Sequence, residues 1–392
     1  MIVVNDIKFA VTPGSDVIDT SYFLIICVDS TAGVQNPYRL LGVRMHMHTA
    51  TVRDRLRDVT DPDLEDDIVS LGLVNAIDID ESTSTIRISL ALGAPYSPAE
   101  SKIATQVREV LADMEYDLDL AATIPSVESE DEVLPGVTNV IAVASGKGGV
   151  GKSTVAVNLA TGLSDLGARV GLFDADIYGP NVPRMVDAGE APETEDEQTI
   201  IPPEKYGMKL MSMAFLVGED DPVIWRGPMV HQILTQLVED VRWGDLDYLV
   251  LDLPPGTGDT QLTILQTLPL TGAVVVTTPQ DVAVDDARKG LRMFGEHDTN
   301  VLGIVENMAS FTCPDCESIH DIFGEGGGQV FAANNDLPFL GSLPLDPQVR
   351  TGSDDGDPAV LGSGTTADAF EAMTTNVADM IGVTRRRDVM NR

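Results

Sequence analysis

A glycine-rich segment near the middle of the chain has the residue types and spacing of a phosphate-binding loop. The segment SGKGGVGKST, residues 145–154, satisfies the pattern GxxxxGK[ST]. Glycines let backbone N–H groups converge on phosphate oxygens at a helix N-terminus, while Lys152 is expected to reach the outer phosphates and Ser153 to bind Mg²⁺. The predicted nucleotide-binding residues are Gly146, Lys147, Gly148, Gly149, Val150, Gly151, Lys152, Ser153 and Thr154.

Three aspartates follow apolar segments that have the composition of strands. In VLDLPPGTGD, Asp252 comes after an apolar run, where a carboxylate binds magnesium, usually through water. In LFDADIYGPNVP, Asp174 and Asp176 are two residues apart and therefore lie on the same side of an extended segment. One of them can face the metal and the other the attacking water. For either aspartate taken alone, the alternative is a helix cap or a surface charge. This alternative becomes weaker if Asp174, Asp176 and Asp252 all lie where strands terminate at the same edge of the sheet.

The segment CPDC, with Cys313 and Cys316, is a second candidate site. A lone CxxC fits a redox dithiol, half of a zinc site, half of an iron-sulfur site, or chance. It supplies two thiolates, whereas a [4Fe-4S] cluster is usually held by four, and two copies of the chain across a twofold axis would provide them. His320 lies four residues further on; an exposed polar histidine is favoured there over a third zinc ligand.

The elements that must position these residues begin at about residue 139. Short β-branched runs alternate there with helix-length segments; the runs are VIAVAS, RVGLFDAD, YLVLDLP, AVVVTTP and VLGIVENM. This pattern predicts an α/β fold, with a mostly parallel sheet covered by helices on both faces. The last helix, ADAFEAMTTNVADMIGV, is expected to pack along the edge of the sheet.

A small α+β domain is predicted before this sheet, at residues 48–122. It contains helical spacing in TVRDRLRDV, a capped turn and second helix in DPDLEDDIVSLGLV, an alternating strand in TIRISLAL and a helix in PAESKIATQVREVLADM. Residues 123–136 are acidic, include Pro125 and Pro135, and lack periodicity, as expected of a linker. The larger domain then covers 137–392.

Residues 1–47 form an extension of uncertain character. It carries the apolar run SYFLIICV, in which Cys27 fits a buried structural cysteine. An appended strand pair is one hypothesis for this extension. The other is a true start at Met45 or Met47.

The charge balance excludes a general nucleic-acid footprint. The chain has 62 acidic and 25 basic residues and a formal net charge of −37. The acidic residues are spread along the chain, which indicates a halophilic surface, because the Debye length is only about 3 Å at 1 M salt. Three cysteines, no apolar run of membrane-spanning length and no signal-peptide pattern predict a cytoplasmic protein with no membrane partner.

Eight motifs occur in the order found in the Mrp/Nbp-type iron-sulfur cluster carrier ATPases, which the chain resembles. They are KGGVGKS, DADIYGPNVP, WRGPMV, DLPPGTGD, VENMA, CPDC, IFGEGGG and LGSLPLDPQVR. The resemblance covers residues 137–382, and residues 48–122 resemble the small iron-sulfur assembly domain that often precedes this ATPase. It implies a P-loop NTPase fold of the deviant-Walker-A class, ATP and Mg²⁺ as cofactors, and a homodimer with a bridging [4Fe-4S] cluster delivered to apo iron-sulfur proteins.

The same resemblance implies roles for individual residues. Lys147 would be the signature lysine that reaches the nucleotide of the other subunit, where an ammonium stabilises charge in phosphoryl transfer; a solvated loop lysine is the alternative. Asp176 would orient or activate water, which leaves Asp174 for magnesium with Ser153 and Asp252. Asn307 would contact the adenine, and the absence of an NKxD-like guanine-reading motif favours ATP over GTP.

The small domain departs from the family pattern at one position. Many relatives have a cysteine in a motif like TPACP, whereas this chain has GAPYSP, with Ser97. A serine hydroxyl is a poor ligand for a soft metal, so this domain is expected to be a docking module that does not coordinate iron in that way.

These features predict a slow ATP hydrolase that carries iron-sulfur clusters. The main alternative is a nucleotide-switched positioning or partition-type ATPase without a cluster. That alternative predicts a membrane helix or a DNA-binding surface, which the tail MIGVTRRRDVMNR and the acidic composition do not favour. A third hypothesis is an electron donor like the nitrogenase iron protein, whose cluster cysteines lie far apart in sequence and not as CxxC.

Substitution of the two loop lysines is expected to have different effects. Lys152→Ala should abolish nucleotide binding or hydrolysis, because it removes the cation closest to the outer phosphates. Lys147→Ala should spare initial binding and reduce hydrolysis, because a lysine acting across a dimer contributes mainly in the transition state. Nucleotide titration and steady-state hydrolysis measure the two effects, and equal loss of affinity in both variants would contradict the role of Lys147.

Overall fold

The computed structural model describes residues 47–124, 133–176, 179–189, 191–195, 199–216, 233 and 236–391. The run SYFLIICV with Cys27, the motif WRGPMV and most of the predicted linker lie outside these residues.

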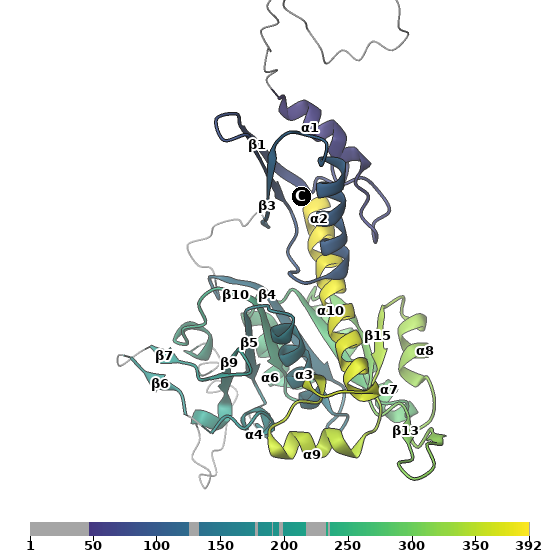
Figure 1. Cartoon of the computed structure of the whole chain (residues 1–392). Coiled ribbons are helices and arrows are strands. Elements are labelled where there is room, and N and C mark those ends of the chain that lie inside the picture. Colours follow the sequence, from purple (N-terminus) through teal and green to yellow (C-terminus); the bar gives the residue numbers. More distant parts are fainter. Residues whose placement is uncertain are drawn as a thin grey trace, which may run out of the picture.

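An eight-stranded sheet forms the centre of the larger unit (Figure 1). Its order is β15-β12-β11-β4-β10-β5-β9-β8, and neighbours are parallel except β8 with β9. The strands are β4 (Val137–Ser145), β5 (Val170–Asp174), β8 (Glu204–Lys205), β9 (Met208–Ser212), β10 (Leu246–Asp252), β11 (Gly272–Thr277), β12 (Val301–Glu306) and β15 (Phe339–Ser342). The five predicted strands are confirmed as β4, β5, β10, β11 and β12, and the α/β fold class is confirmed with them.

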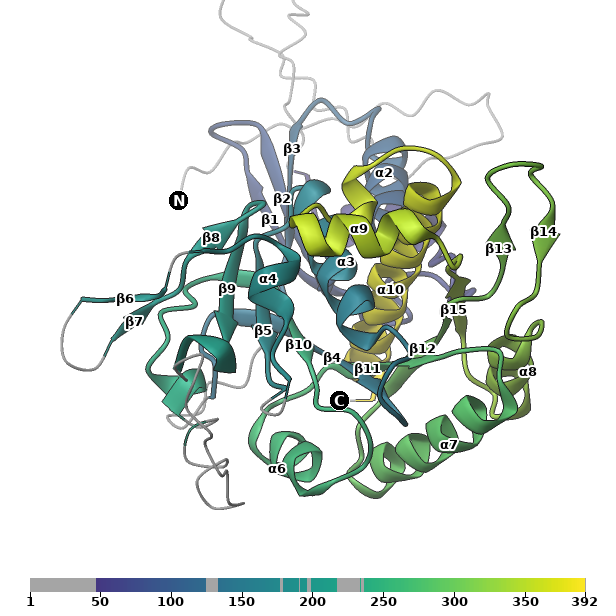
Figure 2. The same cartoon turned by 90° about the horizontal axis from the view of Figure 1, so that it is seen from below.

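Helices cover both faces of this sheet (Figure 2). One face carries α3 (Lys152–Asp165), α4 (Val182–Met185), α9 (Pro347–Asp355) and α10 (Thr365–Met390); the other carries α6 (Asp259–Thr267), α7 (Asp281–Glu296) and α8 (Gly327–Asn334). The side chains of β10 alternate between the two cores: Tyr248 and Val250 pack in one, Leu249 and Leu251 in the other. Burial on both faces explains why the strands are continuous apolar runs.

The small unit contains a three-stranded sheet, in which β1 pairs antiparallel and β3 parallel with the central strand β2. Its elements are α1 (Thr49–Arg55), η1 (Leu56–Asp58), β1 (Val74–Asp80), β2 (Thr85–Leu90), α2 (Pro98–Val110) and β3 (Asp117–Ala122). The predicted strand and final helix are confirmed as β2 and α2. The sequence analysis missed β1 and β3.

The second helix predicted in DPDLEDDIVSLGLV is wrong, because this segment forms consecutive turns. Asp61 Oδ1 accepts the N–H groups of Asp63 and Leu64 at 2.9 and 3.1 Å. Asp67 Oδ1 does the same with the N–H groups two and three residues later, at 3.0 and 2.8 Å. Aspartate side chains that bind their own backbone in this way compete with helical hydrogen bonds.

The last helix, α10, is longer than predicted and joins the two units. It contacts the edge strand β15, as expected, and also α3, β12 and, beyond the sheet, α2 of the small unit (Figure 1). The predicted helix ended at Val383, and no helix was predicted for the basic tail after it. The tail continues the helix because Arg386 is fully buried against acidic side chains of the small unit.

Arg386 holds three carboxylates of the small unit. Its guanidinium lies 2.7 Å from Asp61, 2.6 Å from Asp63 and 3.3 Å from Glu100. Arginine suits such a position because its planar group presents five donors and stays charged when buried.

Ser97 makes a second contact with the same helix. Its hydroxyl accepts the N–H of Glu100 at 3.2 Å, which caps α2, and donates to Asp379 Oδ1 on α10 at 2.6 Å. The side chain is fully buried. The serine that stands in place of the expected cysteine is therefore enclosed between the small unit and α10.

None of the helices in the described parts of the chain combines the length and hydropathy that crossing a bilayer requires.

Replacing Arg386 is expected to destabilise the chain strongly. Arg386→Ala leaves the carboxylate of Asp61, which is fully buried, without its counter-charge, and removing one partner of a buried ion pair costs about 3–5 kcal/mol. Chemical denaturation measures the loss. The neighbouring exposed residue provides the control: Arg387→Ala should change the free energy of unfolding by less than about 0.5 kcal/mol, and similar effects of the two variants would contradict this account of Arg386.

Candidate functional site

The predicted phosphate loop connects the end of β4 to the start of α3. Gly151, the last residue before α3, has φ +84°, and a Cβ atom there would lie 2.1 Å from Asn307 Nδ2. Both the left-handed conformation and the close contact require glycine. The N-cap residue of α3 is this glycine, which has no side chain to cap the helix, so the first N–H groups of α3 are available to an anion.

Lys152 and Asp252 form a buried ion pair beneath this loop. Their side chains are 6% and 1% exposed, and Lys152 Nζ contacts Asp252 Oδ1 while also donating to Ser153 Oγ at 3.3 Å. Burial raises the pKa of Asp252, and the Lys152 ammonium opposes this shift. Within the described residues, the other oxygen of Asp252 has no hydrogen-bond partner. A buried oxygen with free lone pairs beside the Ser153 hydroxyl fits Mg²⁺, which prefers such hard ligands.

Asp174 lies beside Asp252 because β5 and β10 are paired in register at these two residues. Asp174 Oδ2 accepts from Ser212 Oγ at 3.0 Å and from Val182 N at 3.1 Å. Burial, followed by the charge of Asp252, raises the pKa of Asp174 to about 7. The sequence analysis missed Ser212; its position at the end of a strand, in MKLMS, was the available signal.

Asp176 lies two residues beyond the end of β5. Its N–H donates to Asp174 Oδ1 at 3.2 Å, and its own Oδ1 accepts from Gly179 N at 3.3 Å. The structure therefore brings Asp174, Asp176 and Asp252 to one edge of the sheet, as the sequence predicted.

A cavity of about 400 Å³ opens beside the loop. Gly151, Ser153 and Thr154 line one side together with Asn307. The amide of Asn307 donates to Val150 O at 2.8 Å, and its oxygen accepts the N–H of Met308 at 2.9 Å. The volume, and the position next to the loop, suit the base and sugar of a nucleotide.

Two arginines in the wall of this cavity were missed by the sequence analysis. Arg350, on α9, lines it directly, and so does Arg184, which lies 3.4 Å from Asp354. Lysine and arginine are scarce in the chain, with only 25 residues in total. The available signal was therefore the arginine at the end of the motif LGSLPLDPQVR, which is Arg350.

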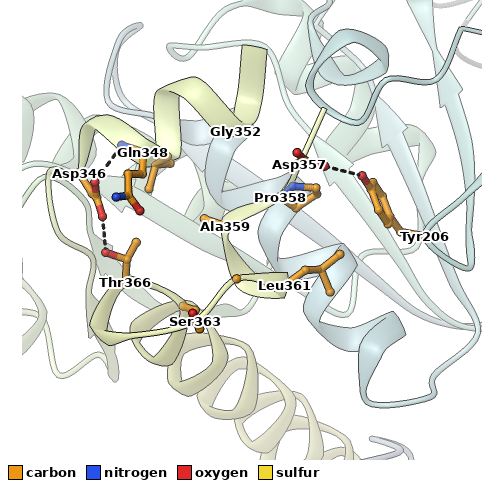
Figure 3. A pocket seen from close by; sticks show the side chains of 13 residues that line it. Tyr206, Asp346, Gln348, Gly352, Asp357, Pro358, Ala359, Leu361, Ser363 and Thr366 are labelled. Atoms are coloured by element: carbon orange, nitrogen blue, oxygen red, sulfur yellow. Dashed lines mark hydrogen bonds between the residues drawn. The ribbon is translucent and has the colours of Figure 1, made fainter. Parts of the chain in front are cut away.

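A second cavity of about 320 Å³ is drawn in Figure 3, and residues of α9 line both cavities. Asp346 lines both cavities: one of its oxygens caps α9 through Gln348 N at 2.8 Å, and the other accepts from Thr366 Oγ1 at 2.6 Å. None of the residues of α9 is buried. A wall with so little packing is among the less stable parts of a fold.

Lys147 is half-buried within the loop. Its carbonyl oxygen accepts from Ser145 Oγ at 3.0 Å. Its ammonium has no hydrogen bond or ion pair with the described residues. The ammonium of Lys147 is therefore not held by a polar contact with its own described chain.

The two cysteines lie between β13 (Phe311–Thr312) and β14 (Ile319–His320), at the tip of a hairpin. Both are free thiols, Cys313 half-buried and Cys316 exposed. The hydroxyl of Ser318, 3.4 Å from Cys316 Sγ, lowers the pKa of Cys316, and the Ser318 N–H and the Cys313 thiol act in the same direction. A lower pKa increases the thiolate fraction, the form that binds metal.

Where the structure describes the chain, no three His, Cys, Asp or Glu side chains are grouped so that they could hold a metal ion. His320 therefore does not complete a site with the two cysteines.

A glycine-rich loop between a parallel strand and a helix, with a buried lysine facing aspartates at the ends of neighbouring strands, defines a P-loop NTPase. Residues 136–380 match the family described as NUBPL iron-transfer P-loop NTPase, and residues 49–119 match the iron-sulfur cluster assembly protein family. The chain belongs to the NUBPL iron-transfer P-loop NTPase family.

Three known proteins illustrate the similarity. The iron-sulfur cluster carrier protein of Deinococcus radiodurans is 42% identical over 344 residues, covering 86% of this chain and 96% of that protein. A mitochondrial iron-sulfur protein of Arabidopsis thaliana required for NADH dehydrogenase is 49% identical, covering 62% of this chain and 79% of its own. The nucleotide-binding protein of Archaeoglobus fulgidus in complex with ADP superposes with a TM-score of 0.52 at 38% identity, covering 59% of this chain and 92% of that one.

The carboxyl of Asp174 is expected to make stability depend on pH in protein free of nucleotide and magnesium. Its pKa is about 7 in the folded chain and about 3.8 in the unfolded chain, so between these values the folded state binds one more proton. The free energy of unfolding should therefore fall as pH rises towards 7.

The variant Asp174→Asn isolates this contribution. The stability of the wild type relative to the variant should decline by at most roughly tenfold in the unfolding equilibrium constant per pH unit between about pH 4 and 7, and level off above it. Urea denaturation over this range measures both curves. Parallel curves would contradict a raised pKa at Asp174.

Proposed function

We propose that the protein is an ATP-dependent carrier that binds a [4Fe-4S] cluster between the Cys313 and Cys316 pairs of two subunits and delivers it to apo-proteins. The observation that carries this proposal is the pair of free thiols at the tip of a hairpin on a P-loop NTPase. Each chain offers two thiolates, and the described residues add no further ligand beside them. Four thiolates, the usual number for this cluster, then require a second subunit.

The relatives support transfer of iron-sulfur clusters over a positioning role. Proteins of two organisms are named iron-sulfur cluster carrier or transfer proteins, and the chain is 42% and 52% identical to them. An electron donor of the nitrogenase type would have its cluster cysteines far apart in sequence, whereas here they are three positions apart.

Exposed apolar side chains near the cysteines support the homodimer. Ile319, Ile322 and Val330 are 69%, 57% and 59% exposed, and they belong to the hairpin and to the helix that follows it. Large exposed apolar side chains are typical of surfaces that a partner covers. Dimerisation through this region would bring the four thiols together and exclude water from the cluster.

The proposed nucleotide chemistry begins with the buried ion pair. Lys152 would move its ammonium from Asp252 to the outer phosphates, while Ser153, Asp174 and Asp252 would hold magnesium. Mg²⁺ neutralises charge on the phosphate oxygens when bound. Asp176 would orient the attacking water, and Asn307, in the cavity wall, would contact the adenine.

Lys147 would act on the nucleotide of the other subunit in this scheme. Its ammonium has no partner within its own described chain, and a second cation would stabilise the charge that develops during hydrolysis. The subunit contact that brings the thiols together would then also complete the hydrolytic site.

The cysteines are expected to be required for the cluster but not for nucleotide binding. After anaerobic reconstitution in molar KCl, the wild type should absorb near roughly 400 nm and contain about four irons per dimer, because thiolates are the ligands of such clusters. Cys313→Ser or Cys316→Ser should remove the absorption, since serine replaces a soft ligand poorly. ATP titration should give similar affinities in both variants.

Cys27→Ser provides the control, because Cys27 is the third cysteine of the chain. It should retain the cluster. One bound zinc with no iron in the wild type, or four irons per monomer after both CxxC cysteines are changed, would contradict the proposal.

A further inference from the structure

The two cysteines belong to an excursion from the sheet, residues 309–325, that we call the cysteine hairpin (Figure 2). It leaves the sheet after β12 and returns at α8. The outgoing end is held by backbone hydrogen bonds of Ala309 N to Leu343 O, 2.9 Å, and of Leu345 N to Ser310 O, 2.7 Å. Its position therefore depends on what holds its two ends.

Glu306 holds the returning end. It is the last residue of β12, its side chain is 2% exposed, and its Oε2 accepts the N–H of Gly328 in the first turn of α8. A Cβ atom at position 328 would lie 3.0 Å from both Cβ and Oε2 of Glu306. The N-cap residue of α8 is Gly326, which has no side chain to cap the helix, and the carboxylate of Glu306 performs this role.

The next residue, Asn307, holds the outgoing end to the phosphate loop. Its amide donates to Val150 O at 2.8 Å. Its oxygen accepts the N–H of Met308, which has φ +58°. A methionine in the left-handed region is strained and persists only where neighbours hold it. The turn that begins the hairpin is thus held by a side chain that also binds the loop.

Consecutive residues at a strand end point to opposite sides. Glu306 faces the hairpin's return, and Asn307 faces the nucleotide cavity, of which it forms part of the wall. A shift of the loop carbonyl at Val150 must move Asn307 or break its hydrogen bond. If Asn307 follows the loop, the strand end on which Glu306 holds α8 moves with it, and if the bond breaks, that strand end loses its contact with the loop.

We propose that Glu306 is a positioning residue for Cys313 and Cys316, and that through it and Asn307 the state of the phosphate loop sets the arrangement of the two thiols. Any effect of this link on delivery of the cluster rests on the proposed function, whereas the link itself does not. Coupling between two sites is reciprocal, so the hairpin also acts on the affinity for nucleotide.

The test measures thiol reactivity in the full chain without a cluster. Iodoacetamide alkylation of Cys313 and Cys316 is followed by peptide mass spectrometry, with and without Mg²⁺ and a non-hydrolysable ATP analogue. In the wild type, the analogue should change the rate by about fivefold or more, a typical coupling between sites. Nucleotide titration shows that each variant is folded.

Two conservative variants of Glu306 should show whether the position of its side-chain oxygen or its negative charge is required. Glu306→Asp keeps the charge but shortens the side chain by one methylene, so it should lose the nucleotide response. Glu306→Gln keeps an acceptor oxygen at the same reach and should retain it. Glu325→Ala is the control, because Glu325 is an exposed acid beside the same glycines, and it should respond like the wild type.

The inference is overturned if the wild type shows no nucleotide response, if Glu306→Asp keeps the full response, or if Glu325→Ala loses it equally. Failure of the proposed function would look different: the thiols would respond as expected while neither wild type nor variants take up a cluster. Conversely, the wild type could carry the cluster while Glu306→Asp keeps the full nucleotide response of its thiols. This result would contradict only the coupling through Glu306 and not the proposed function.

Discussion

The buried ion pair between Lys152 and Asp252 is the interaction on which the rest of the site depends. An isolated charge in this position would carry a large desolvation penalty, so each charge needs a partner. Asp252 has the lysine, while the neighbouring Asp174 has only hydrogen-bond donors, and its pKa rises to about 7. Charge is therefore balanced within a few ångströms of the phosphate loop, and any group that brings phosphates or a metal there must rearrange these three side chains.

The same sheet edge explains how one site reaches distant parts of the molecule. The parallel strands β12, β11, β4, β10 and β5 lie side by side in this order. Their ends therefore bring together the loop, both aspartates and the Glu306–Asn307 pair, which are far apart in sequence. Residues at the end of β12 contact the phosphate loop on one side and the start of α8 on the other. A nucleotide site and a thiol site can share one strand end because the fold places both on it.

The helix α10 joins the small unit to the larger unit. It packs on α3, the helix that begins at the phosphate loop, and its last turns enclose Arg386 and Asp379 against Asp61, Glu100 and Ser97. Where a cysteine was expected from the family pattern, the chain has a buried capping serine bound to this helix. A serine in this position agrees with the expectation that the small unit does not coordinate iron there. In the proposed function, the cluster ligands are therefore the two thiols of the cysteine hairpin.

The sequence by itself determined the features that depend on local order along the chain. The glycine spacing of the loop, the apolar runs of five strands and the CxxC each require only neighbouring residues, and so the parallel sheet and the family could be predicted. Local preference also misled, because the acidic segment after residue 60 resembled a helix, whereas Asp61 and Asp67 bind their own backbone.

Tertiary structure alone decided which distant residues meet. Lys152 pairs with Asp252, Ser212 contacts Asp174, and Glu306 caps α8. The extension of α10 to Met390 depends on Arg386 and its carboxylates, and the residues joined by all these contacts are separated by 22 to 325 positions. The basic tail of α10 has no apolar periodicity that would indicate a buried helix. Arg386 is buried there only because three carboxylates of the small unit compensate its charge, and that compensation exists only after the two units have packed together.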